Sequence, residues 1–116
     1  MVSIKQKQEI INSLNRYEAR KALFQKAILR ETNRVLLEEY KKAVIEAEAS
    51  IRAVILTAND LNVNYKITEG CREDAEALAK EFKLDIGNTR GLVIYTRYEV
   101  AADQRVFDEE TAPAAS

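Results

Sequence analysis

The side chains that most often perform enzymatic chemistry are scarce in this chain of 116 residues. It contains no histidine, which removes the commonest general base and the commonest metal ligand. Its single cysteine, Cys71, is expected near the start of a helix, where the dipole favours a thiolate. The neighbouring Glu69, Glu73 and Asp74 oppose a thiolate, and no histidine can serve as its base. We therefore interpret Cys71 as a small residue packed against the core.

Two further groups could do chemistry. Carboxylates are frequent between residues 38 and 48, but Lys41 and Lys42 interleave with them, which is typical of a solvated helix surface. Residues 87–91 carry two glycines and Arg90 and could bind an anion, but they match neither a phosphate-binding loop nor a dinucleotide fingerprint. We interpret them as a connection between a helix and a strand. The sequence thus predicts no catalytic residue, no cofactor and no metal ligand, and we expect a protein that is not an enzyme.

Charge is distributed unevenly along the chain. Residues 1–34 contain eight basic and three acidic residues, whereas residues 62–116 contain seven basic and eleven acidic ones. A basic face on one helix could follow a nucleic-acid backbone. It could equally be solvated, or pair with the acidic C-terminal part of the same or another chain. The basic residues that share a helix face, and are the candidate nucleic-acid contacts, are Lys5, Arg16, Arg20, Lys26, Arg30 and Arg34.

Residues 1–69 contain neither glycine nor proline, the strongest breakers of regular structure, which indicates long helices or strands there. Apolar residues there recur at alternating steps of three and four, the seam of packed helices. One seam contains Ile10, Leu14, Tyr17, Phe24, Ile28 and Val35, and the other contains Leu37, Tyr40, Val44, Ala47, Ile51, Val54, Ala58 and Leu61. The pattern predicts helices over residues 4–30 and 34–61.

The two seams are out of phase, because Ile28 and Leu37 are nine residues apart, about half a turn from register at 100° per residue. A turn around Thr32 and Asn33, residue types that cap helices and form turns, would let the seams face each other. We therefore expect an antiparallel helical hairpin. The alternative is one continuous helix of nearly 60 residues with a different partner on each face.

The second helix also carries an apolar line outside its seam. This line consists of Ile45, Ala49, Ala53 and Leu56. A helix that is apolar on more than one side is buried on more than one side. We therefore expect a homo-oligomer, with contact to another protein or to the C-terminal part as alternatives. The residues predicted to take part in self-association are Leu37, Tyr40, Val44, Ile45, Ile51, Val54 and Leu56.

The C-terminal part is predicted to form a strand–helix–strand unit. Alternation at Val63, Tyr65 and Ile67 indicates a short strand, and Thr68 could cap a helix that begins near Cys71. Ala75, Leu78, Ala79 and Phe82 would form the apolar face of that helix, and Gly87 would mark its end. Residues 92–100 form the strongest strand candidate, and the pairing could be parallel or antiparallel. Tyr95 and Tyr98 would lie on opposite faces of that strand, one in the core and one on the surface.

Taken together, the sequence predicts a mainly α protein with a small α+β C-terminal part. We expect one domain over residues 1–107, made of the hairpin (4–61) and the strand–helix–strand unit (62–107), and a loose acidic tail over 108–116. No apolar run suits a signal peptide or a membrane span, and one cysteine fits a reducing, cytoplasmic compartment. The hypothesis is a non-enzymatic structural or interaction module, such as an assembly or accessory component, that self-associates through coiled-coil-like helices. Nucleic-acid binding through the first helix is the alternative.

Overall fold

The computed structural model describes residues 3–70, 72–87 and 95–101 and consists mainly of helix. In chain order its elements are α1 (Ile4–Ile28), α2 (Arg34–Asp60), β1 (Tyr65–Glu69), α3 (Arg72–Glu81) and β2 (Thr96–Val100). Two long helices precede a two-stranded sheet and a short helix, which confirms the predicted fold class. The expected tail, residues 108–116, and residues 92–94 of the predicted second strand lie outside the described residues.

The long helices form the antiparallel hairpin, which confirms the prediction, and the alternative of one continuous helix is wrong. Local hydrogen bonds define the turn between them. The carboxylate of Glu31 accepts the backbone N–H groups of Thr32 and Asn33 at 3.1 and 2.9 Å. The side chain of Asn33 then caps α2 by accepting the N–H groups of Val35 and Leu36. Because these bonds satisfy backbone groups that a continuous helix would use internally, the chain reverses here without glycine or proline.

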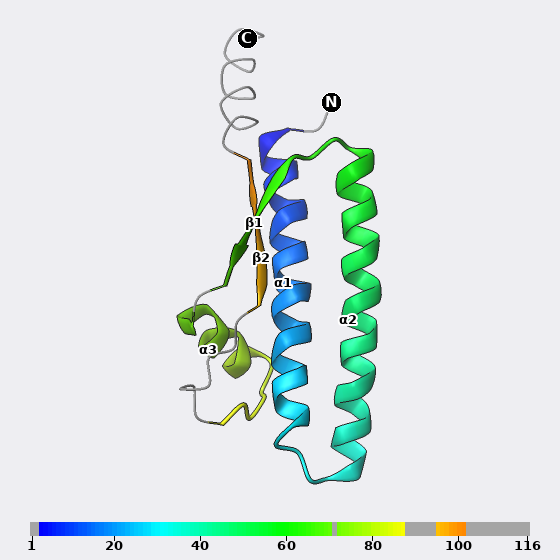
Figure 1. Cartoon of the computed structure of the whole chain (residues 1–116), viewed down its shortest axis with the longest axis vertical. Helices are drawn as coiled ribbons and strands as arrows, with labels where there is room; N and C mark the ends of the chain where they lie inside the picture. Colours follow the sequence, from blue (N-terminus) through cyan, green and yellow to red (C-terminus); the bar gives the residue numbers. More distant parts are fainter. Residues whose placement is uncertain (1–2, 71, 88–94, 102–116) are drawn as a thin grey trace, which may run out of the picture.

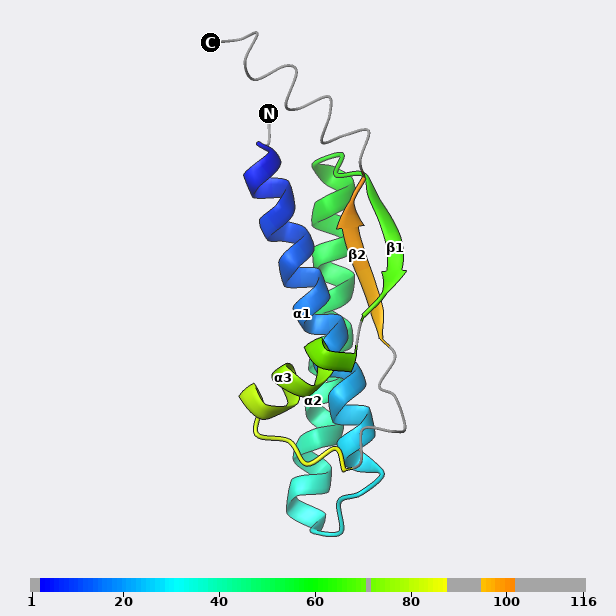
Figure 2. The same cartoon turned by 90° about the vertical axis from the view of Figure 1, so that its left-hand side faces the viewer.

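Helix α1 is the centre of the molecule. Helix α2 packs along one side of it, and the sheet and α3 lie on the other side, the sheet beside the N-terminal half of α1 and α3 beside its C-terminal half (Figures 1 and 2). Each half of α1 contributes to a different apolar cluster. The first cluster joins α1, α2 and the sheet through Ile11, Leu14, Ile51, Ala58, Val63, Tyr98 and Val100. The second joins α1, α3 and its flanking segments through Ala19, Leu23, Ala75, Ala79, Ile86 and Tyr95.

The end of α2 directs the chain into the sheet. Asn62 has a positive φ of 56°, a conformation that asparagine adopts more readily than most residues. Its N–H donates to the carbonyl of Asn59, and the N–H of Val63 donates to the carbonyl of Ala58. This Schellman arrangement satisfies the last carbonyls of the helix and brings Val63 into the same cluster as Ala58.

The two strands pair antiparallel, with Tyr65 opposite Val100 and Glu69 opposite Thr96, which decides the pairing that the sequence left open. Thr68 lies within β1, where its hydroxyl donates to the carbonyl of Arg97. The expectation that Thr68 caps α3 is therefore wrong, because Thr68 belongs to β1, which continues to Glu69, and α3 begins at Arg72.

A side chain of α1 closes the outer edge of β2. The side-chain amide of Asn15 donates to the carbonyl of Tyr98 at 2.8 Å, and its oxygen accepts the N–H of Tyr98 at 2.6 Å. Tyr98 is opposite Ile67 in the sheet. In an antiparallel pair of strands every second residue pair forms the interstrand hydrogen bonds, and the pair of Tyr98 and Ile67 is not one of these. The backbone N–H and C=O groups of Tyr98 therefore point away from β1. Asn15 therefore takes the place of a third strand.

Tyr98 of β2 and Tyr95, the residue before β2, are both buried. Tyr98 is in the first cluster with 8% of its surface exposed, and Tyr95 is in the second with 5% exposed. The prediction that one of them lies on the surface is wrong, because α3 covers the face that the strand alone would leave open. The ring of Tyr95 packs on the Cα of Gly70, where a β-carbon would overlap the ring.

Helix α3 ends at Glu81, well before Gly87, so the predicted stop at that glycine is also wrong. The residue that ends the helix is Lys83, which has a φ of 58°. Its N–H donates to the carbonyl of Lys80, and the N–H of Leu84 donates to that of Ala79. A lysine thus occupies the left-handed position that glycine usually takes at the end of a helix. The position of Gly87 therefore did not predict where α3 ends.

Candidate functional site

The predicted self-association residues divide between two opposite sides of α2. The seam residue Ile51 is only 7% exposed, and Leu37, Tyr40, Val44 and Val54 are half-buried. Helix α1 is the element packed against α2 (Figure 1), and Ile51 lies in the first apolar cluster with residues of α1, while Val54 packs against that cluster. The phenolic ring of Tyr40, for example, lies 5.5 Å from the ring of Phe24, measured between centroids. This part of the set is used inside the hairpin.

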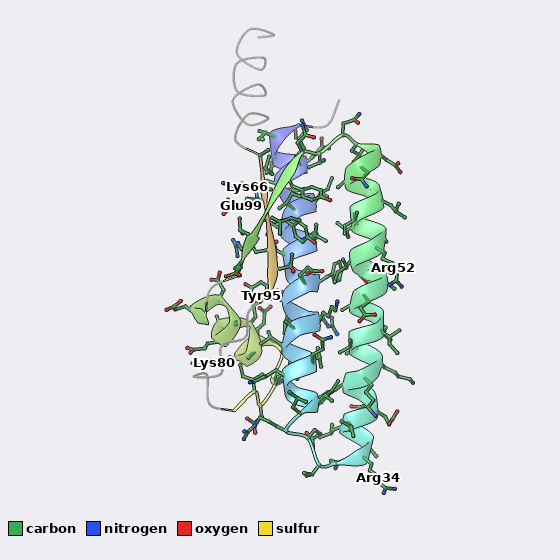
Figure 3. All side chains as sticks on the ribbon, in the orientation of Figure 1. Arg34, Arg52, Lys66, Lys80, Tyr95 and Glu99 are labelled. Atoms are coloured by element: carbon green, nitrogen blue, oxygen red, sulfur yellow. The ribbon has the colours of Figure 1, made fainter. Side chains whose placement is uncertain are left out.

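The other two residues, Ile45 and Leu56, lie on the opposite side of α2 and are 64% and 63% exposed. Ala49 and Ala53 lie between them along the helix and are also exposed. Figure 3 shows Arg52, from the same stretch, pointing away from α1. We call Ile45, Ala49, Ala53 and Leu56 the outer stripe. No described element covers the outer stripe, so its apolar surface faces solvent in the single chain.

Some basic residues of α1 and of the turn after it make contacts inside the chain. Arg16 forms two hydrogen bonds with the carboxylate of Glu81 in α3, at 2.7 and 3.3 Å. The hydrogen bond from Arg16 lowers the pKa of Glu81, and the same bond raises the pKa of Arg16. Arg30 lies 3.5 Å from the carboxylate of Asp85. These two arginines therefore pair with the acidic C-terminal part of the same chain.

The remaining candidate nucleic-acid contacts do not form one surface with them. The guanidinium of Arg20 lies 5.5 Å from the ring centroid of Phe24 and 5.9 Å from that of Phe82, which makes it part of the packing between α1 and α3. Lys5 is exposed near the start of α1, Lys26 is half-buried, and Arg34 is exposed at the start of α2. A continuous cationic stripe, which phosphate binding requires, is thus interrupted by aromatic contacts and by Glu81 and Asp85.

The packing of α1, α3 and β2 leaves a surface pocket of about 450 Å³. Its charged lining is internally balanced, because Arg97 pairs with Asp74 at 3.2 Å and Arg16 pairs with Glu81. The amide of Asn15, also in the lining, is already bonded to the backbone of Tyr98. The pocket therefore offers no converging group that lacks a partner, and its geometry does not resemble a catalytic constellation.

A half-buried carboxyl group lies near the sheet. Burial raises the pKa of Glu18, while Lys21 and a hydrogen bond with Thr96 lower it. Burial also raises the pKa of Tyr98, and the charge of Glu18 adds to that shift. Both raised pKa values are explained by burial at the edge of the core.

The raised pKa of Glu18 predicts a pH-dependent stability. Because the folded protein holds this proton more tightly than the unfolded chain, the contribution to stability is complete below the unfolded pKa of about 4.5. It is lost as the pH rises through the folded pKa. Glu18→Gln stays neutral, so its melting temperature should rise relative to wild type between pH 4 and pH 7. Thermal unfolding measures this, with the exposed Glu9→Gln as control; a constant difference for Glu18→Gln would contradict it.

The described residues contain neither a metal-binding cluster nor a membrane-spanning helix, and two sequence candidates lie outside them. Within residues 3–70, 72–87 and 95–101, no group of three or more His, Cys, Asp or Glu side chains could hold a metal ion. Among the helices described, none combines the length and the apolar character that a membrane span requires. Cys71 and residues 88–91 of the proposed anion loop lie outside the described part of the chain.

Comparison with known proteins adds nothing to this geometry. No protein-family model, curated protein or solved structure matches the chain. The outer stripe is therefore the candidate functional site on the strength of its own exposure. Sequence reasoning found the outer stripe from its spacing but missed Asn15, because an amide that caps a distant strand leaves no periodic signal.

Proposed function

We propose that this protein is a non-enzymatic structural or protein–protein interaction module that self-associates through the outer side of α2. The observation that carries the proposal is the exposure of Ile45 and Leu56, about two-thirds of each side chain, on one line of a long helix. Large contiguous apolar patches on soluble proteins commonly mark an interaction surface. Burying such surface is favourable by roughly 25 cal/mol per Å².

The internal use of the seam supports the same proposal. The hairpin already buries the seam of α2 against α1, so the need to hide that seam does not require a partner. The outer stripe has no such internal use, and it is the surface on which a second copy would be accommodated. A role as an assembly or accessory component is consistent with a small module whose long helix has one buried and one exposed apolar side.

Replacing both large residues of the outer stripe by arginine tests the proposal. We expect wild type to sediment as an oligomer at micromolar concentration and Ile45→Arg/Leu56→Arg to sediment as a monomer with unchanged helical circular dichroism. Both side chains are exposed in the single chain, so the substitutions should not unfold it. Ile67→Arg is the matched control, because this isoleucine of β1 is 69% exposed but lies elsewhere. A wild type that remains monomeric would rule out self-association.

Nucleic-acid binding is the less well supported alternative, because Arg16 and Arg30 already pair with carboxylates of the same chain. Affinity for mixed-sequence DNA or RNA at two salt concentrations distinguishes it, since phosphate contacts weaken steeply as salt increases.

A further inference from the structure

The outer side of α2 has a symmetric order of large and small apolar residues, with opposite charges at its two ends. At 100° per residue, six positions between residues 42 and 60 lie within about 80° of one another on the side opposite the seam, and Val35 and Glu38 continue this side toward the start of α2. In chain order the six positions read lysine, isoleucine, alanine, alanine, leucine and aspartate. These positions are Lys42, Ile45, Ala49, Ala53, Leu56 and Asp60. The large apolar residues flank two small ones, and opposite charges lie at the two ends.

This order fits a second copy that runs antiparallel. If a two-fold axis that passes near residue 51 relates two α2 helices, Ala49 of one copy faces Ala53 of the other, and Ile45 faces Leu56. Lys42 then faces Asp60 at both ends. Neither Lys42 nor Asp60 has an ion-pair partner among the residues that the structure describes.

Two charged residues lie on one flank of the outer stripe. Arg52 lies on one flank and points away from α1 (Figure 3). Glu48, one turn earlier on that flank, is 40% exposed and lies 3.9 Å from Lys21. A two-fold axis near residue 51 places Arg52 of each copy at the level of both Glu48 and Arg52 of the other, so this flank does not select the orientation. The charges at the ends of the stripe do select it, because a parallel, in-register pair would oppose Lys42 to Lys42 and Asp60 to Asp60, and such like-charge contacts are unfavourable.

We infer that the protein forms a two-fold symmetric dimer in which the outer sides of two α2 helices pack antiparallel about a point near residue 51. This inference rests on the proposed self-association and adds its partner, a second copy of this chain, and its geometry. The small Ala49 and Ala53 at the centre allow the helix axes to approach to the short end of the usual 8–10 Å range.

A distance between two labels tests the orientation. A nitroxide label is attached to Lys42→Cys in a Cys71→Ser chain whose sedimentation matches that of wild type. Eighteen residues separate Lys42 from Asp60, so an antiparallel dimer places the two position-42 backbones about 30 Å apart. Copies labelled at position 42 mixed with copies labelled at position 60 should give a short distance, about 10 Å between backbones. A short 42-to-42 distance in an intact dimer would overturn the inference but not the self-association.

Charge variants provide a test without cysteine substitution. Lys42→Glu places two acids together at each end of an antiparallel pair, so the dimer dissociation constant should rise several-fold. The double variant Lys42→Glu/Asp60→Lys restores opposite charges and should return it to the wild-type value. In a parallel dimer Lys42→Glu only replaces a contact between two lysines with a contact between two glutamates. A dissociation constant that does not change in Lys42→Glu would therefore overturn the inference. A chain that is monomeric in every variant and in wild type would instead refute the proposed function itself.

Discussion

Leu14→Ala should destabilise the protein by about 2–5 kcal/mol, the range measured for truncated core leucines. Leu14 has no exposed surface and lies in the first apolar cluster, between Ile11 on α1 and residues of α2 and the sheet. The truncation removes buried methyl groups and leaves a cavity that three packed elements cannot easily close. The loss would be a large fraction of the stability of a domain of this size, which is typically 5–15 kcal/mol. Urea unfolding followed by circular dichroism measures it.

Leu29→Ala is the matched control for this prediction. The side chain of Leu29 is 81% exposed at the end of α1, so the same chemical change should shift the unfolding free energy by less than about 0.5 kcal/mol. Comparable losses for Leu14→Ala and Leu29→Ala would mean that Leu14 is not in a packed core.

Asn15→Ala should cost about 2–4 kcal/mol, although alanine is the better helix former. The substitution removes the acceptor of the Tyr98 N–H and the donor to the Tyr98 carbonyl. Tyr98 is 8% exposed, so water cannot freely replace these partners. A buried polar group left without a partner costs about 1–3 kcal/mol. Urea unfolding measures the total, and amide hydrogen exchange of Tyr98 should become faster.

Asn12→Ala provides the comparison, because it is the same substitution three residues earlier on α1. The side chain of Asn12 is exposed and accepts a hydrogen bond from Gln8, so its loss should have little effect. The gain in helix propensity is the same at both positions and cancels in the difference. If both variants unfold at the same urea concentration, Asn15 does not support the strand edge.

The hairpin is the part of the fold that local patterns predict best. The two seams and the half-turn between Ile28 and Leu37 were enough to place a reversal near Thr32 and Asn33, and the observed helix ends at residues 28 and 60 differ from those expected by one or two residues. The reason is physical: helix periodicity and capping depend on neighbours within about one turn. Such neighbours are visible in the chain itself.

The candidate site was predicted in part for the same reason. Spacing alone separated the outer stripe from the seam, and the structure leaves Ile45 and Leu56 of that stripe uncovered. Spacing could not show that Leu37, Tyr40, Val44, Ile51 and Val54 are used by α1, because one apolar seam suits an internal and an external partner equally well. The antiparallel dimer stays a prediction.

Contacts between distant segments decided the rest. The basic side of α1 looked continuous in projection, but α3 and the segment after it place Glu81, Phe82 and Asp85 against it. Tyr95 became a core residue because α3 packs over it, and Thr68 stayed in a strand because β2 pairs with it. The sequence by itself therefore determined the helices, their reversal and the outer stripe, since these depend on short-range periodicity. Only the tertiary structure decided strand pairing, the Asn15 cap and the fate of the arginines, since each depends on residues more than sixty positions apart or on elements that meet only in space.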